Sequence, residues 1–184
     1  YTHILNVPKV ASRYSPFAFG DKFFLYQFWG WKNSEPARAH LWALHFIHDG
    51  TTWAAGGSAS KQALIDLGWD EKVEFVPYWR KGTGISVTSP VQGVIASGWK
   101  RGGGNLLVMV LNDSDAAASC ELTVDFAGFG FASAAVKCHD YGGGGLVCPD
   151  SFQDVTPKSQ IAEKGKQIPL EIGRHSYRML RFCE

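Results

Sequence analysis

The sequence predicts an all-β protein, an antiparallel β-sandwich of about eight strands that follows an aromatic, partly helical N-terminal segment. Two observations support this fold class. Short strand-like segments separated by turn signals fill the later part of the chain, and all seven tryptophans lie within the first 99 residues. A chain of 184 residues is long enough to bury one sizeable core. We therefore divide it into an N-terminal aromatic and helical segment, residues 1–70, and a C-terminal β-sandwich, residues 71–184.

The strand segments begin after residue 72 and recur about every ten residues. They are rich in β-branched and aromatic side chains, and glycine-rich or Asn/Asp-rich turns separate them. Regular short strands of this kind are typical of antiparallel sandwiches. Residues 146–165 lack the pattern, so we expect a long loop there. The predicted strands are residues 73–79, 85–88, 93–100, 105–111, 120–126, 134–139, 167–172 and 176–182.

Two helices are expected before the sandwich. Ser34 precedes a segment with apolar residues at helical spacing, and a serine there can cap free backbone N–H groups, so a helix begins at this point and stops near Gly50. A shorter helix over residues 61–67 ends at Gly68, in the left-handed position that usually closes a helix. Residues 50–60 should form a flexible connection between the two.

Charge and composition exclude several classes of function. The net charge is +1, which gives no general attraction to nucleic acids or anionic membranes. We find neither an apolar stretch of about 18 residues nor a basic segment followed by an apolar one at the start, so we expect no membrane span and no signal peptide. The glycine runs at residues 102–104 and 142–145 lack the Gly-Lys-Ser/Thr of a phosphate loop. We therefore predict no cofactor, no nucleic-acid partner and no membrane partner.

The four cysteines do not have the spacing of a zinc site. Cys120, Cys138, Cys148 and Cys183 include no Cys-x-x-Cys pair. Cys138 and Cys148 bracket a glycine-rich loop and could close it as a disulfide. The alternative is buried free thiols in a reducing compartment.

One group of residues has the composition of a metal site. His45, His48 and Asp49 fall at i, i+3 and i+4 and can share a helix face, and two imidazoles with a carboxylate can bind a transition metal. No glutamate base lies between the histidines, which favours structural roles. On that interpretation His45 packs in a helix interface, and His48 with Asp49 ends the helix. We assign no metal site.

Aromatic side chains near the N-terminus could bind carbohydrate. Flat tryptophan and tyrosine rings stack on the C–H faces of sugars, and Tyr26, Trp29 and Trp31 lie close to Asn33, whose amide can bond hydroxyl groups. We take these four residues as the candidate carbohydrate-binding set. The alternative is that the rings fill a core between helix and sheet.

A pair of carboxylates for glycoside cleavage is not defined by any motif. The acids of the N-terminal part resemble turn and cap residues, and no nucleophile elbow of the Gly-x-Ser-x-Gly type is present. The catalytic residues therefore remain unknown. The acids considered are Asp21, Glu35, Asp49, Asp66, Asp70, Glu71 and Glu74.

Several motifs together resemble a known arrangement. A short helix at residues 61–70 leads into Val-Glu-Phe-Val-Pro-Tyr-Trp-Arg at 73–80, a hairpin follows, and the chain closes on Ile-Gly-Arg-His-Ser-Tyr-Arg-Met-Leu-Arg at 172–181. From residue 35 onward the chain resembles the C-terminal β-sandwich that follows the (β/α)8 barrel in many glycoside hydrolases. It is most similar to uncharacterised bacterial glycoside-hydrolase-like proteins of that plan.

This resemblance implies a non-catalytic accessory function. The sandwich would support a preceding, carbohydrate-active barrel, residues 1–60 would be the end of that barrel, and the protein would be extracytoplasmic, either periplasmic or secreted. Whether the chain is an enzyme by itself stays open. Two alternatives belong to other classes: a free-standing carbohydrate-binding module with an aromatic platform, and a self-sufficient hydrolase that uses acids of the N-terminal part.

Overall fold

The computed structural model describes residues 35–50, 58–143 and 156–184. Within these ranges it contains nine strands in two antiparallel sheets and two short helices, so the predicted all-β sandwich with a partly helical N-terminal segment is confirmed. None of the described helices is long and apolar enough to cross a membrane. The helices are α2 (Glu35–Phe46) and α3 (Ser58–Leu67), and the strands are β1 (Glu74–Val76), β2 (Ile85–Thr88), β3 (Val94–Lys100), β4 (Asn105–Asn112), β5 (Ala118–Val124), β6 (Ala135–Asp140), β7 (Lys158–Glu163), β8 (Ile168–Ile172) and β9 (Ser176–Cys183).

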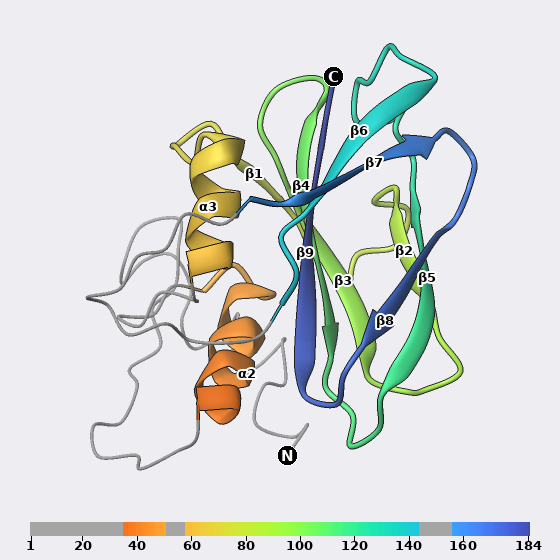
Figure 1. Cartoon of the computed structure of the whole chain (residues 1–184). Coiled ribbons are helices and arrows are strands. Elements are labelled where there is room, and N and C mark those ends of the chain that lie inside the picture. Colours follow the sequence, from red (N-terminus) through yellow and green to blue (C-terminus); the bar gives the residue numbers. More distant parts are fainter. Residues whose placement is uncertain (1–34, 51–57, 144–155) are drawn as a thin grey trace.

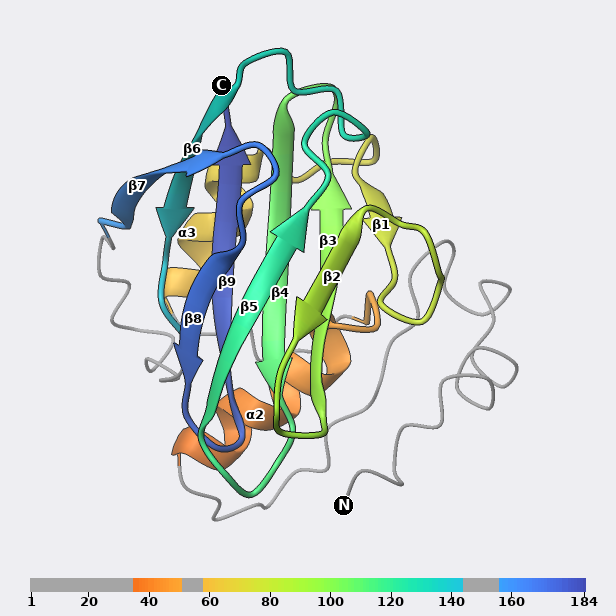
Figure 2. The ribbon, with the colours of Figure 1, turned by 90° about the vertical axis from the view of Figure 1, so that its right-hand side faces the viewer.

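The described elements form three layers. A six-stranded sheet of order β1-β3-β4-β9-β6-β7 lies in the middle, and a three-stranded sheet of order β2-β5-β8 covers one of its faces. Helices α2 and α3 cover the opposite face (Figures 1 and 2). The central sheet therefore has two cores, one against the small sheet and one against the helices.

Strand β4 shows why its sequence is apolar without interruption. Leu106 and Val108 belong to the core between the sheets, whereas Leu107 and Met109 belong to the core under the helices. Successive side chains of a strand point to opposite faces, and here both faces are buried, so the positions between Asn105 and Asn112 are all apolar. Strand β9 pairs with β4 from Asn105↔Cys183 to Asn112↔Ser176 and shares this central position.

Both helices end in the same hydrogen-bond pattern. After α2, the Gly50 N–H donates to the His45 carbonyl and the Asp49 N–H to the Phe46 carbonyl, with Asp49 at φ 63°. After α3, the left-handed residue is Gly68, as predicted. This pattern satisfies carbonyl groups that the helix leaves free. The predicted cap Ser34 lies outside the described residues.

Three local predictions were wrong. Residues 146–165 were expected to be a loop, but β7 lies within them and pairs with β6. Its side chains are exposed except for Ala162, because it is an edge strand with one weakly covered face, and such a strand shows no apolar alternation. Helix α3 begins inside the connection expected over 50–60, and β1 has three residues where seven were expected.

The thiols of the described part are structural. Cys120, Cys138 and Cys183 are free, and Cys148, the other half of the possible disulfide, lies outside the described residues. Burial raises the pKa of Cys138 to about 12. Because the thiolate is the reactive form, this thiol should be inert.

Replacement of Gly143 by a larger residue should destabilise the fold. A Cβ added there would overlap the backbone carbonyl of Tyr177, so the chain must shift. We expect Gly143→Ala to lower the free energy of unfolding by roughly 1–3 kcal/mol, measured by urea denaturation. Gly103→Ala is the matched control, since its nearest neighbour would be at an ordinary 3.6 Å. Equal stability of the two variants would contradict the predicted close approach.

Candidate functional site

The predicted carbohydrate-binding residues Tyr26, Trp29, Trp31 and Asn33 all lie outside the described residues. Whether they form a platform therefore stays a prediction. The described aromatic residues show how the rest of the ring-rich segment is used.

Aromatic rings fill the core between the helices and the central sheet. Phe46 of α2 stacks on Trp99 of β3 with ring centroids 4.2 Å apart and on Trp42 with centroids 4.9 Å apart, and Trp69 lies 5.7 Å from Phe46. Trp79, by contrast, is 44% exposed. We call the layer of buried residues between the helices and the central sheet the helix–sheet core. Its buried members are Ala39, Trp42, Ala43, Phe46, Ile47, Ala63, Leu67, Trp99, Leu107, Met109, Leu111, Tyr141, Tyr177 and Met179.

The His45, His48 and Asp49 group has structural roles. His45 is buried, His48 contacts the Leu44 carbonyl (2.6 Å) and the Tyr78 hydroxyl (3.1 Å), and Asp49 accepts the Trp99 indole N–H at 2.9 Å. Burial is the main cause that lowers the pKa of both histidines, that of His45 to about 4. These contacts agree with structural roles for His48 and Asp49.

Several candidate acids also have structural partners. Asp66 of α3 accepts the Tyr141 hydroxyl at 2.5 Å, and burial with this bond raises the pKa of that tyrosine. Asp70 pairs with Arg101 at 2.8 Å, which lowers the pKa of the carboxyl group. These contacts tie α3 and its C-terminal turn to residues of the sheet and its loops.

A groove of about 480 Å³ lies beside β2 and the end of β5. Its charged side chains are engaged in the fold, because Asp125 accepts the Gly128 N–H at 3.1 Å and Lys164 donates to the Phe131 carbonyl at 3.0 Å. Both charged side chains that line the groove thus contact the backbone of the fold.

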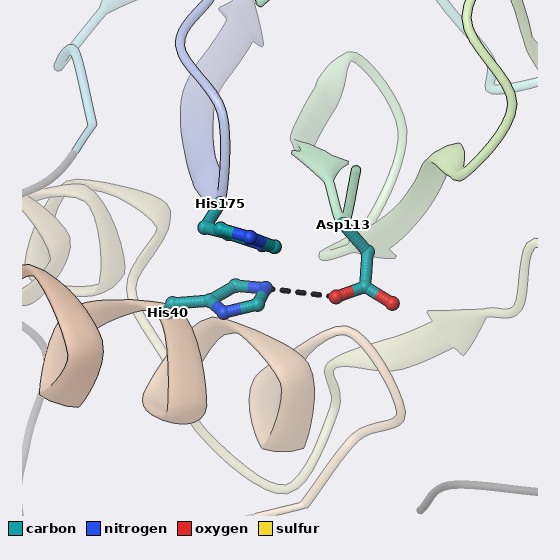
Figure 3. Close-up of side chains that lie close together, drawn as sticks. All are labelled: His40, Asp113 and His175. Carbon is teal, nitrogen blue, oxygen red and sulfur yellow. Dashed lines mark ion pairs between the residues drawn. The ribbon is translucent and has the colours of Figure 1, made fainter. Parts of the chain in front are cut away.

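A second polar group lies where α2 meets the end of the sandwich. His40 projects from α2, Asp113 follows β4, and His175 lies in the turn between β8 and β9 (Figure 3). One potential ligand atom from each lies within 4.8 Å of the other two. His40 Nε2 is 2.9 Å from Asp113 Oδ1, and the two imidazole centroids are 4.7 Å apart. We call these three residues the His–Asp–His cluster.

Two ring nitrogens of the cluster are buried without a hydrogen bond. They are Nε2 of His40, whose short contact with Asp113 lacks the direction of a hydrogen bond, and Nδ1 of His175. The other nitrogen of His175, Nε2, lies 2.9 Å from Asp115 Oδ1. This contact favours the tautomer that carries its proton on Nε2 and leaves the lone pair on Nδ1.

Asn112 holds the two loops that supply the cluster. Its side chain is fully buried and donates to the carbonyls of Ala116 (2.7 Å) and Gly173 (3.1 Å), which lie in the loops before β5 and before β9. Its Oδ1 accepts the Ser114 N–H at 3.1 Å. The His175 N–H in turn donates to the Ser114 carbonyl at 3.3 Å. A buried amide with all these partners fixes Asp113 and His175 relative to each other.

Sequence reasoning missed this cluster because its residues lie far apart in the chain. His40 is the only one of the three within the helix whose histidines were considered. Asp113 was assigned to a turn, and His175 lay just before the last predicted strand. The one available signal was the pairing of β4 with β9. The register Asn112↔Ser176 places the Asp113 turn and the His175 turn at the same end of the sheet.

Comparison with known proteins gives no match: no family model matches the chain, and no curated protein or solved structure is significantly similar to it.

Proposed function

We propose that this chain is the non-catalytic C-terminal β-sandwich region of a glycoside-hydrolase-like protein, and that it supports a carbohydrate-active domain that precedes it. The proposal includes a periplasmic or secreted location. Carbohydrate is the expected substrate of the preceding domain, and contact between sugar and the N-terminal aromatic residues of this chain is part of the same proposal.

The observation that supports it is the helix–sheet core. Helices α2 and α3 bury Trp42, Phe46 and Leu67 against the central sheet, in the same core as Trp99 of β3. Side-chain bonds join the same layers, such as Ser60 Oγ to the Tyr177 hydroxyl at 2.9 Å. Because these helices are fixed to the sheet, a domain joined to them would be held in a defined position relative to the sandwich. A supporting domain requires such a fixed connection.

Candidate acids of the described part support a non-catalytic role. Asp49, Asp66 and Asp70 bind an indole, a phenol and a guanidinium group of the fold, respectively. A glycosidase needs two carboxyl groups that face each other about 5–10 Å apart across an open site. These three acids are used for structure instead.

A free-standing carbohydrate-binding module is the second candidate, favoured by one observation. Among the tryptophans of the described part, Trp79 is the exposed one. It packs beside Tyr78 with ring centroids 5.1 Å apart. An exposed ring of this kind can stack on a sugar. Together with Trp29 and Trp31 it would provide the platform that this alternative requires.

The two candidates predict different results when the purified chain is titrated with oligosaccharides. As an accessory region, it should hydrolyse no glycoside. Its tryptophan fluorescence should stay unchanged at millimolar sugar when the preceding domain is absent, because the proposed contact with sugar is made at the junction with that domain. Quenching that Trp79→Ala or the Trp29→Ala/Trp31→Ala pair abolishes would support the binding module. Hydrolysis by the chain alone would overturn the non-catalytic assignment. An upstream reading frame that encodes no barrel-sized domain would overturn the supporting role.

A further inference from the structure

We propose that His40, Asp113 and His175 bind one divalent transition-metal ion, for which Zn²⁺ is the best match, and that the ion joins α2 to the end of the β-sandwich. The inference is independent of the accessory function proposed above, because it rests on the His–Asp–His cluster alone (Figure 3).

The donor set fits the chemistry of zinc. Two imidazole nitrogens and one carboxylate oxygen are ligands that Zn²⁺ prefers, whereas Mg²⁺ and Ca²⁺ prefer oxygen alone. Zinc–ligand bonds of about 2.0–2.1 Å place tetrahedral ligand atoms about 3.3 Å apart. In the cluster one pair, His40 Nε2 and Asp113 Oδ1, is at 2.9 Å, and all three atoms lie within 4.8 Å. Binding of one ion would require side-chain rotations that bring the more distant atoms to about 3.3 Å from one another.

The unpartnered nitrogens are the observation that distinguishes a metal site from a simple ion pair. A buried polar atom without a hydrogen bond destabilises the fold, and Nε2 of His40 and Nδ1 of His175 are both in that condition. An ion pair between His40 and Asp113 would account for neither the poor alignment of that contact nor the bare nitrogen of His175. A metal ion between the three side chains accounts for both.

Asp115 has the position of a supporting residue. Metal-bound histidines usually donate their second ring N–H to a carboxylate or carbonyl oxygen, which fixes the tautomer and raises ligand basicity. His175 Nε2 lies 2.9 Å from Asp115 Oδ1, so Nδ1 is the nitrogen left for the metal. Asp115 is thus a positioning residue, and Asn112 holds the turns that carry both side chains.

Access to the site is limited to one side. The His40 and Asp113 side chains are 15% and 14% exposed, and that of His175 is 37% exposed. Three protein ligands leave a fourth position of a tetrahedral ion for water or for another ligand. The ion would be held by three partly buried side chains, of which His175 is the most exposed.

The test is zinc binding by the whole purified chain after treatment with a chelator. Isothermal titration with ZnCl₂ should give one site per chain, and zinc should raise the midpoint of thermal unfolding, because a ligand that binds only the folded state stabilises it. His40→Gln, Asp113→Asn and His175→Gln should each weaken binding by a hundredfold or more. Asp115→Asn should weaken it by about tenfold, as expected for an outer partner.

His139→Gln is the matched control, since His139 lies on β6 with Ser159 as its partner and should leave zinc affinity unchanged. If a cluster variant fails to fold, histidine NMR signals of the wild-type chain decide instead: zinc should shift the His40 and His175 ring signals and not those of His139. Absence of zinc binding at micromolar concentrations, or binding that shifts other histidines and survives the cluster substitutions, would overturn the proposal.

Discussion

Replacing Trp99 by alanine is expected to lower the free energy of unfolding by about 3–5 kcal/mol. Its side chain is fully buried in β3, stacks on Phe46 at 4.2 Å and lies 5.5 Å from Phe75 between ring centroids. The substitution also removes the indole N–H that donates a hydrogen bond to Asp49. Since a domain of this kind has a total stability of about 5–15 kcal/mol, the variant should be near the limit of folding.

The matched control for this prediction is Trp79→Ala. Trp79 belongs to the same aromatic group but is 44% exposed, so its loss should cost about 1 kcal/mol or less. Urea denaturation followed by circular dichroism measures both variants. If the two substitutions cost the same, Trp99 does not join the helices to the sheet in the way described.

Lowering the pH should destabilise the fold through His45. Its pKa is lowered from 6.5 to about 4, mainly by burial and secondarily by His48. The unfolded chain therefore binds a proton that the folded chain refuses, so stability is full above about pH 6.5 and falls as the pH drops from 6.5 to 4. The shift corresponds to a loss of about 3 kcal/mol at the acid end of that window.

Two measurements check this prediction. Histidine NMR should show no protonation of His45 above about pH 5. An ordinary solvent-exposed histidine side chain titrates near pH 6.5. In denaturant titrations at several pH values, His45→Gln should flatten the dependence of stability on pH between 4 and 6.5. A titration of His45 near pH 6.5 would show that it is not buried as described.

Strands that carry apolar side chains toward a core were predictable because their pattern is local. Strand β2 has the predicted bounds, and β3, β4 and β9 differ from the prediction by one residue at one end, since each carries apolar side chains that a buried sheet requires. Strand β7 was missed for the converse reason. β7 is an exposed edge strand that pairs with β6 through its backbone. Such pairing does not require apolar side chains at alternate positions, so the sequence shows no strand pattern there.

The His–Asp–His cluster was not predictable from spacing. A metal motif can be read from sequence when its ligands share a helix face or a tight loop, as His45 and His48 do. The ligands of the cluster come from a helix and two turns, so their proximity depends on the packing of α2 across the end of β4 and β9. Only the tertiary structure provides that information.

The central claim is that helices α2 and α3 and the central sheet form one structural unit through the helix–sheet core. Native-state hydrogen exchange of the whole chain tests this most directly, because it measures the opening free energy of each element. The account predicts that the slowest amides of α2 and α3 open within about 1 kcal/mol of those of β4 and β9. If the helices open several kcal/mol more easily while the sheet stays protected, the helical layer is an appendage and the supporting function fails.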